Sequence, residues 1–210
     1  MSLPEETMAR RPIAARSSGW AIALSGRLAR AGVTPNAISV VSVLFAAIGG
    51  VLIFAIDQWW GWLVAAACVQ LRLVCNLLDG MVAIEGGRKS KVGAIYNEFP
   101  DRIADTLFLV PAGYAAGLPW LGWAAALLAA LTAYVRVFGG AVGLVQDFGG
   151  LMAKQRRMAA LTLGLVAQSI EAPLFGTHWS LLVTAAIIAA GSLVTCITRT
   201  LAIAAALEHK

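Results

Sequence analysis

Long apolar segments separated by short polar connections occupy the chain from residue 37 to its end. An α-helix needs about 20 mainly apolar residues to cross the hydrocarbon core of a bilayer. The segments are close to that length, so the pattern predicts an all-α integral membrane protein with six transmembrane helices. We expect these helices at 37–56, 60–84, 93–117, 119–142, 157–173 and 179–205, of which 157–173 is the shortest.

The segment before the first predicted span has a different pattern, "PIAARSSGWAIALSGRLARAGVTPN". Arg16, Arg27 and Arg30 recur among its apolar residues, which is typical of an amphipathic helix lying on the membrane surface. The turn-forming "GVTPN" ends this helix, and we expect Asn36 to cap the first spanning helix. The chain thus divides into an N-terminal segment with an interfacial helix, 1–36, and a six-helix transmembrane domain, 37–210.

The composition agrees with a membrane protein. Of the 210 residues, 60% are hydrophobic and 13% are charged, whereas an average soluble domain has roughly 25% charged residues. The net charge of +5 is explained by lipid phosphate and by membrane orientation. We expect membrane lipids as partners and no nucleic acid, because no surface of mixed aromatic and basic residues is evident.

The basic residues indicate how the protein is oriented. Every connection that contains Lys or Arg falls on one side of a six-span chain, so the positive-inside rule predicts that both termini are cytoplasmic. We expect a bacterial inner membrane. The basic residues on this side are Arg10, Arg11, Arg16, Arg27, Arg30, Arg88, Lys89, Lys91, Lys154, Arg156, Arg157 and Lys210. An aromatic belt is expected at the other side, from Trp59, Trp60, Trp62, Trp120, Trp123 and Trp179.

Acidic residues interrupt the second and third predicted spans near their cytoplasmic ends, although an ionisable residue inside a span costs about 2.5–3.5 kcal/mol. Residues three or four apart share a helix face. One face of the second span carries Asn76, Asp79, Gly80 and Ala83, and one face of the third carries Asn97, Asp101 and Asp105. Converging oxygens suit a hard cation. A metal site, polar helix packing and an ion path all stay open at this point.

These two faces resemble the signature of the CDP-alcohol phosphatidyltransferases, D-x-x-D-G-x-x-A-R, a short spacer, then G-x-x-x-D-x-x-x-D. The first half reads Asn76, Asp79, Gly80, Ala83 and Ile84. In the register that keeps both final acids, the second half reads Asn97, Asp101 and Asp105; the other register begins at Gly93. The chain therefore departs from the signature at Asn76, Ile84 and Asn97. The segments "GVTPNAIS" and "AYVRVFGGAVG" are also similar to family segments.

The resemblance implies a CDP-linked lipid donor, an alcohol acceptor, CMP release, Mg²⁺ or Mn²⁺ as cofactor and a homodimer. It also implies residue roles. Metal ligands would be Asp79, Asp101 and Asp105, with Asn76 as a weakened ligand and Glu98 as a compensating acid. The catalytic base would be Asp105. Contacts to the nucleotide would come from Gly80, Ala83 and Asn97.

A second basic group lies toward the cytoplasmic ends of the fourth and fifth predicted spans. Because many acceptors of this family carry a phosphate, we expect Arg136, Lys154 and Arg156 to bind it, and simple positive-inside anchoring is the alternative for the last two. Arg72 is expected to pair with a carboxylate or to extend to the interface. Two alternative functions stay open: a transporter, which the absence of an internal repeat disfavours, and a catalytically inactive family relative.

Overall fold

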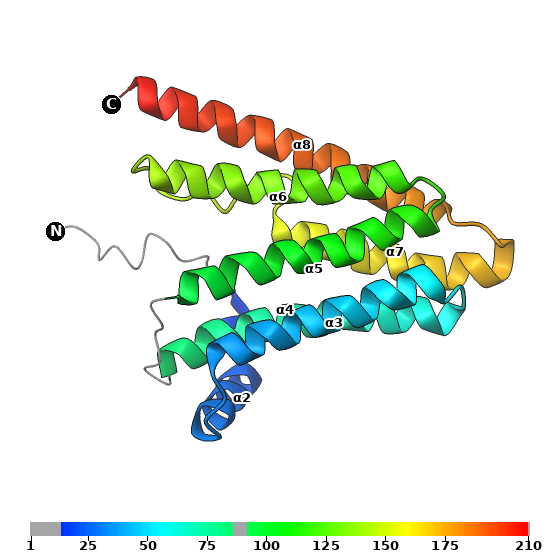
Figure 1. Ribbon diagram of the computed structural model, residues 1–210, viewed down its shortest axis with the longest axis horizontal. Coiled ribbons are helices and arrows are strands. Elements are labelled where there is room, and N and C mark those ends of the chain that lie inside the picture. Colours follow the sequence, from blue (N-terminus) through cyan, green and yellow to red (C-terminus); the bar gives the residue numbers. More distant parts are fainter. Residues whose placement is uncertain (1–13, 86–91, 210) are drawn as a thin grey trace.

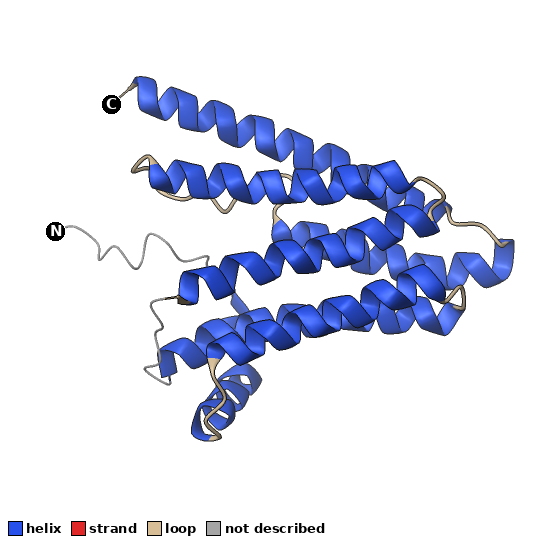
Figure 2. Cartoon of the chain, in the orientation of Figure 1, coloured by secondary structure: helices blue, strands red, loops and turns tan. Residues whose placement is uncertain are grey.

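The computed structural model describes residues 14–85 and 92–209, and every regular element within them is a helix (Figures 1 and 2). A short 3₁₀ turn and a twelve-residue helix precede six long helices. The elements are η1 Ala14–Ser17, α2 Gly19–Arg30, α3 Pro35–Ala55, α4 Trp59–Glu85, α5 Gly93–Ala115, α6 Pro119–Ala141, α7 Lys154–Phe175 and α8 Trp179–Glu208.

The long helices run antiparallel to their neighbours in sequence and form one bundle (Figure 1). Within the described residues, α3, α4, α6, α7 and α8 are long and apolar enough to cross a membrane. The prediction of an all-α membrane protein is confirmed. Helix α5 contains several charged residues and is not among those five, but it has 23 residues and packs against both α3 and α6. Its crossing of the membrane stays a prediction.

The span expected at 157–173 is longer than its apolar pattern indicated. Helix α7 begins at Lys154 and has 22 residues, because its basic first turn continues the helix beyond the apolar part. The expected cap of the first long helix was wrong. Thr34 occupies that position and its Oγ1 accepts a hydrogen bond from the Ala37 N–H at 3.2 Å, while Pro35 begins α3. A proline at the first helical position needs no hydrogen bond of its own.

Helix α2 lies beside the bundle and packs against α4. Its Ala21 and Ser25 are buried, whereas Trp20 is 52% exposed and Ile22 is 50% exposed. One face of the helix therefore packs against α4, and the other presents apolar side chains to its surroundings. This agrees with the interfacial helix that the sequence predicts.

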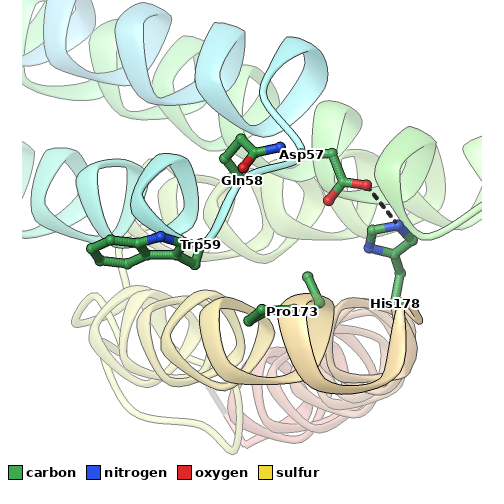
Figure 3. Close-up of a pocket in the computed structure, with 7 residues that line it drawn as sticks. Asp57, Gln58, Trp59, Pro173 and His178 are labelled. Carbon is green, nitrogen blue, oxygen red and sulfur yellow. Dashed lines mark ion pairs between the residues drawn. The ribbon is translucent and has the colours of Figure 1, made fainter.

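The end of the bundle away from α2 is closed by polar contacts (Figure 3). His178 lies 3.5 Å from the Asp57 carboxylate and contacts the edge of the Trp62 ring. Trp62 is 1% exposed, so its assignment to the aromatic belt was wrong: it packs inside the helix ends. The other tryptophans of the predicted belt are largely exposed, namely Trp59, Trp60, Trp120, Trp123 and Trp179.

Helix α3 approaches α5 very closely at Gly50. Pro111 lacks the N–H that would bond the carbonyl four residues earlier in α5, and that Leu107 carbonyl faces Gly50. A Cβ at residue 50 would lie 2.2 Å from the Leu107 oxygen. Only glycine allows this approach, which holds α3 against the helix that carries Asp101 and Asp105.

We therefore expect Gly50→Ala to lower the free energy of unfolding by roughly 1–3 kcal/mol, because the obstructing atom belongs to the backbone and cannot rotate away. The measurement is thermal unfolding of the detergent-solubilised protein. Gly19→Ala is the control, since a Cβ there meets nothing within 4 Å. Equal melting temperatures for the two variants would contradict the packing argument.

Candidate active site

The polar faces of α4 and α5 meet through their side chains, as the spacing predicts. Asn76 of α4 donates a hydrogen bond from Nδ2 to Asp101 Oδ1 of α5 at 2.7 Å. Helix α3 packs against both of these helices and contributes a polar group of its own. The Ser39 hydroxyl donates to Asp79 Oδ2 at 2.7 Å, so α3, α4 and α5 are linked by these contacts.

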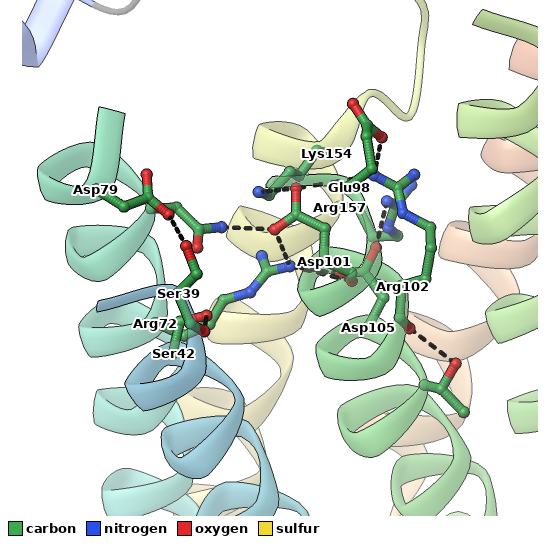
Figure 4. A network of polar contacts seen from close by, with 12 residues as sticks. Ser39, Ser42, Arg72, Asp79, Glu98, Asp101, Arg102, Asp105, Lys154 and Arg157 are labelled. Atoms are coloured by element: carbon green, nitrogen blue, oxygen red, sulfur yellow. Dashed lines mark hydrogen bonds and ion pairs between the residues drawn. The ribbon is translucent and has the colours of Figure 1, made fainter. Parts of the chain in front are cut away.

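Asp101 and Asp105 are buried among cations from α4 and α7 (Figure 4). The Arg72 guanidinium bridges them, with Nη2 at 3.1 Å from Asp101 Oδ1 and 3.0 Å from Asp105 Oδ1. Lys154 Nζ lies 2.5 Å from Asp101 Oδ2, and Arg157 Nη2 lies 2.6 Å from Asp105 Oδ2. Every carboxylate oxygen of these two acids therefore accepts from a protein cation.

The pairing expected for Arg72 is confirmed, and the reason is energetic. Its side chain is fully buried, and a buried charge is tolerated only where partners and hydrogen bonds replace water. Asp101 and Asp105 supply those partners one helical turn apart. The i+4 spacing of the two acids thus creates a binding place for one guanidinium group.

The glycine of the first half-motif faces the N-terminal segment. A Cβ at Gly80 would lie 3.5 Å from Arg16 Nη2, and outside the neighbouring backbone of α4 no other described atom would lie within 4 Å. Ile84, where the signature has Arg, is 45% exposed on the same helix. A guanidinium group therefore reaches this part of α4 from η1. The Asn97 side chain and residues 86–91, which include the predicted basic loop, lie outside the described part.

Glu98 pairs with cations in the structure, and its role as a compensating acid at the metal site stays a prediction. Its Oε1 pairs with Arg136 Nη2 at 2.5 Å and its Oε2 with Arg102 Nη2 at 3.0 Å. The Arg102 pair is the predicted i+4 contact. The Arg136 pair was not predicted, because the spacing within α5 does not report which side chains α6 presents.

Arg136 lines a pocket of about 220 Å³ between α6, α8 and the segment that joins α6 to α7. Arg199 of α8 lies in the same pocket and is buried, with its guanidinium held by the Thr132 carbonyl oxygen at 2.6 Å and by Asp147 at 3.8 Å. The pocket thus combines two arginines with one acid at its rim.

The three basic residues predicted to bind the acceptor phosphate do not lie together in the structure. Lys154 contacts Asp101, and the exposed Arg156 donates to the Gly150 carbonyl oxygen at 3.1 Å, so neither lines the pocket with Arg136. Arg199 was missed. A lone arginine in an apolar span is costly and therefore usually functional, so the sequence did contain an indication of its role. Arg199 belongs to no motif, however.

Among residues 14–85 and 92–209, no group of three or more His, Cys, Asp or Glu side chains is arranged to hold a metal ion. The reason lies in the contacts above. Asp79 is held by Ser39 on α3, and cations take the oxygens of Asp101 and Asp105. The acids are adjacent but separated by guanidinium, ammonium and amide groups.

No family model matches the chain, but curated relatives do. It is 30% identical over 186 residues to the phosphatidylinositol phosphate synthase of Mycolicibacterium smegmatis, covering 81% of this chain and 77% of that protein. It is 28% identical over 190 residues to the phosphatidylinositol phosphate synthase of Mycobacteroides abscessus, covering 84% of this chain and 80% of that protein.

Solved structures share the fold. The phosphatidylinositol phosphate synthase of Mycobacterium tuberculosis with CDP-DAG bound has a TM-score of 0.73 at 20% identity, covering 89% of this chain and 94% of that chain. The same enzyme in complex with manganese and citrate has a TM-score of 0.72 at 20% identity, covering 87% of this chain and 88% of that chain.

The helical membrane fold and these relatives together define a membrane-embedded transferase of phospholipid synthesis. The chain belongs to the CDP-alcohol phosphatidyltransferase family. It transfers a phosphatidyl-type group from a CDP-linked lipid to an alcohol, with release of CMP.

Proposed function

We propose that the donor is CDP-diacylglycerol and that the acceptor is a phosphorylated polyol, such as an inositol phosphate. The observation that carries the acceptor proposal is the pocket that contains Arg136 and Arg199. Planar guanidinium groups bind phosphate through paired hydrogen bonds. The names of the two mycobacterial relatives support the same acceptor class.

The acceptor pocket is connected to the buried acids. Glu98 pairs with Arg136 and lies one helical turn before Arg102 and three residues before Asp101 on α5. A polyol whose phosphate is bound by Arg136 and Arg199 would extend its hydroxyl groups toward α5. Asp105, on the adjacent turn of the same helix, is the base that this arrangement favours.

The side chains at the motif offer the kind of oxygen that a hard divalent ion such as Mg²⁺ or Mn²⁺ prefers, but among the described residues they are paired with other groups and are not arranged around an ion. Asp79, Asp101 and the carbonyl oxygen of Asn76 are the oxygen donors that such ions prefer, and Asn76 already contacts Asp101. Bound there, the ion would neutralise charge on the pyrophosphate of the donor. The manganese complex of the Mycobacterium tuberculosis relative supports this proposal.

The chain's own residues account for the remaining steps. Asp105 accepts the proton of the acceptor hydroxyl, whose oxygen then attacks the lipid-side phosphorus, and the bond from that phosphorus to the CMP oxygen breaks. Arg157 holds Asp105 Oδ2 and fixes the orientation of the carboxylate. We place the nucleotide against Gly80 and Ala83, because small side chains on α4 allow its close approach, and a contact from Asn97 stays a prediction.

We also propose that the end of the bundle carrying this site faces the cytoplasm. The connections at the opposite end, residues 56–58, 116–118 and 176–178, contain no Lys or Arg, as the positive-inside rule requires of an outer side. A bacterial inner membrane and a homodimer remain parts of the proposal.

A panel of acceptors tests the proposed substrate class. Purified protein with CDP-diacylglycerol and Mn²⁺ should form a new phospholipid with inositol phosphate or another phosphorylated polyol, and at least tenfold more slowly with the unphosphorylated polyol, because the loss of a charged hydrogen bond costs about 1.5–3 kcal/mol. Equal rates with both forms would contradict a phosphate-binding pocket.

Arg16 offers a second test, on the nucleotide side. We propose that it supplies the guanidinium that the motif loses at Ile84, since Arg16 Nη2 already lies against Gly80. Arg16→Ala should weaken CDP binding by roughly tenfold, the value of one charged hydrogen bond. Adding Ile84→Arg to that variant should restore the affinity. Calorimetric titration with CDP measures both, and Arg27→Ala is the control.

Unchanged affinity in Arg16→Ala would remove the argument for this contact. Failure of Ile84→Arg to restore a weakened affinity would show that η1 acts through the fold of α2 and not through its charge. The two variants therefore separate a nucleotide contact from a structural effect.

A further inference from the structure

Two arginines line the pocket between α6 and α8, and each lies beside an acid. The two helices pack side by side (Figure 1) and supply Arg136 and Arg199. Arg136 is paired with Glu98, and Arg199 Nε lies 3.8 Å from Asp147 Oδ2. A phosphate that enters this pocket therefore approaches negative charge as well as positive charge.

Arg199 keeps a donor for a ligand. Its Nη1 and Nη2 donate to the carbonyl oxygens of Thr132 and Gly149, whereas its buried Nε has no hydrogen-bond partner within the described part of the chain. The 3.8 Å that separates Nε from Asp147 is too long for a hydrogen bond. Buried donors without partners are rare, and a phosphate oxygen is an acceptor that suits a guanidinium group. Arg199 can therefore bind phosphate while Asp147 stays in place.

Among the described residues that line this pocket, Asp147 has the only side chain that accepts hydrogen bonds. Arginine side chains recognise the phosphate group, which every phosphate monoester shares. A preference for the hydroxyl groups of an acceptor, if a lining side chain provides it, must therefore come from Asp147. Besides Asp147 and the two arginines, the lining residues are Gly139, Leu144, Val145, Ala202, Ile203 and Ala206.

The position of Asp147 is fixed by a turn in the segment that joins α6 to α7. Its Oδ1 accepts a hydrogen bond from the Gly149 N–H at 2.7 Å, the contact by which Asp stabilises a turn two residues further on. Oδ2 is the oxygen that approaches Arg199, and the side chain is 61% exposed. A ligand in the pocket can therefore reach Oδ2 without breaking the turn.

An ionised carboxylate accepts hydrogen bonds and donates none, so Asp147 treats two kinds of phosphate monoester differently. A monoester without hydroxyl groups brings only negative charge, which the carboxylate repels. A polyol phosphate brings the same charge, but one of its hydroxyl groups can donate to Oδ2 and offset the repulsion. Its other hydroxyl groups stay available to α5. Repulsion of one ligand combined with attraction of another is a general route to specificity.

We propose that Asp147 is the residue that selects a polyol phosphate among phosphate monoesters, by accepting a hydrogen bond at Oδ2 from a hydroxyl group of the acceptor. The proposal rests on the proposed function and deepens it, since Arg136 and Arg199 recognise the phosphate and Asp147 recognises the polyol. The neighbouring Gln146 does not have this role, because its amide oxygen accepts a hydrogen bond from Arg136 Nη1.

Calorimetric titration of the full chain in detergent tests the proposal with inositol phosphate and ethyl phosphate, of which only the first has hydroxyl groups. At about pH 8 both are dianions, because the second pKa of a phosphate monoester is about 6. The wild type should bind inositol phosphate at least about tenfold more tightly, the effect of a hydrogen bond to a charged group.

Asp147→Asn should bind ethyl phosphate roughly tenfold more tightly than the wild type does, since the repulsion between the two negative charges is gone. Its affinity for inositol phosphate should change less than about threefold, because the loss of the hydroxyl contact offsets the loss of the repulsion. The preference for inositol phosphate should therefore fall. The variant keeps the turn, because the Asn amide oxygen can accept from the Gly149 N–H.

Asp57→Asn is the matched control. It changes an acid that is 66% exposed and pairs with His178 at the opposite end of the bundle, so both affinities should stay as in the wild type. Equal changes for the two ligands in Asp147→Asn, or no change for either, would overturn the proposal. A wild type that binds both ligands equally would overturn it as well.

CMP release measured on the same samples separates this proposal from the proposed function. A reduced preference in Asp147→Asn, without CMP release by the wild type with any acceptor, would support the role of Asp147 and contradict the activity. CMP release with inositol phosphate, together with an unchanged preference in Asp147→Asn, would support the activity and overturn the role of Asp147.

Discussion

Asp105→Asn should reduce CMP release by at least about 100-fold, because loss of a general base typically costs 10²–10⁴ in rate. Asn keeps the shape of Asp and one oxygen that can accept from either Arg72 or Arg157, but it cannot take the proton of the acceptor hydroxyl. The measurement is the initial rate of CMP formation from CDP-diacylglycerol with saturating acceptor and Mn²⁺. Asp105→Ala should lose the activity altogether.

Two controls separate chemistry from folding. Asp57→Asn changes an acid at the opposite end of the bundle, where it pairs with His178, and should keep its activity. Thermal unfolding of Asp105→Asn should show a folded protein, whereas Asp105→Ala leaves two buried cations unbalanced and should be destabilised by about 3–5 kcal/mol. Full activity in Asp105→Asn would refute the assignment of the base.

Arg199→Met should raise the KM for a phosphorylated acceptor by roughly 10–100-fold and change kcat much less. Arg199 lines the pocket with Arg136 but contacts none of the motif acids in the described structure, so its loss removes binding of the phosphate and not proton transfer. The estimate follows from about 1.5–3 kcal/mol for a hydrogen bond to a charged group. Steady-state kinetics against acceptor concentration measures it.

Arg199→Lys and Arg30→Met serve as comparisons. Lys keeps the charge and should recover part of the affinity, which a purely structural role of Arg199 would not predict, because Lys cannot reproduce the contacts to both the Thr132 and Gly149 carbonyl oxygens. Arg30 is exposed on α2 and its loss should leave the KM unchanged. An unchanged KM in Arg199→Met would contradict the acceptor site.

The helices and the polar faces could be predicted from the sequence, because both depend on spacing along one segment. The i+4 series Asn97, Asp101 and Asp105 defines a face, and the cost of burying Arg72 requires an acidic partner. These local arguments also predicted the Glu98–Arg102 pair.

What could not be predicted depends on which helices are neighbours. Ser39 bonds to Asp79 because α3 packs between α4 and α5, and the 40 residues that separate the two carry no signal of this contact. Arg199 reaches the pocket because α8 packs on α6, and Glu98 turns to Arg136 for a similar reason. Periodicity identifies a polar face but not the element opposite it.

The same contacts bear on the positions where the chain differs from the family signature. Asn76 stands where the signature has an acid, and its Nδ2 donates to Asp101 Oδ1, which Arg72 also contacts. Ile84 stands where the signature has Arg, and Arg16 reaches the same region from η1. The departures are therefore compatible with catalysis, which distinguishes this account from that of a catalytically inactive relative.

Formation of CMP by the purified protein tests that account most directly. With CDP-diacylglycerol, Mn²⁺ and inositol phosphate, the wild type should release CMP and form one phospholipid product for each CMP, and omission of the acceptor or addition of EDTA should stop the reaction. No CMP with any phosphorylated or unphosphorylated acceptor, from a folded protein that still binds CDP, would contradict the account and identify the chain as a binding protein.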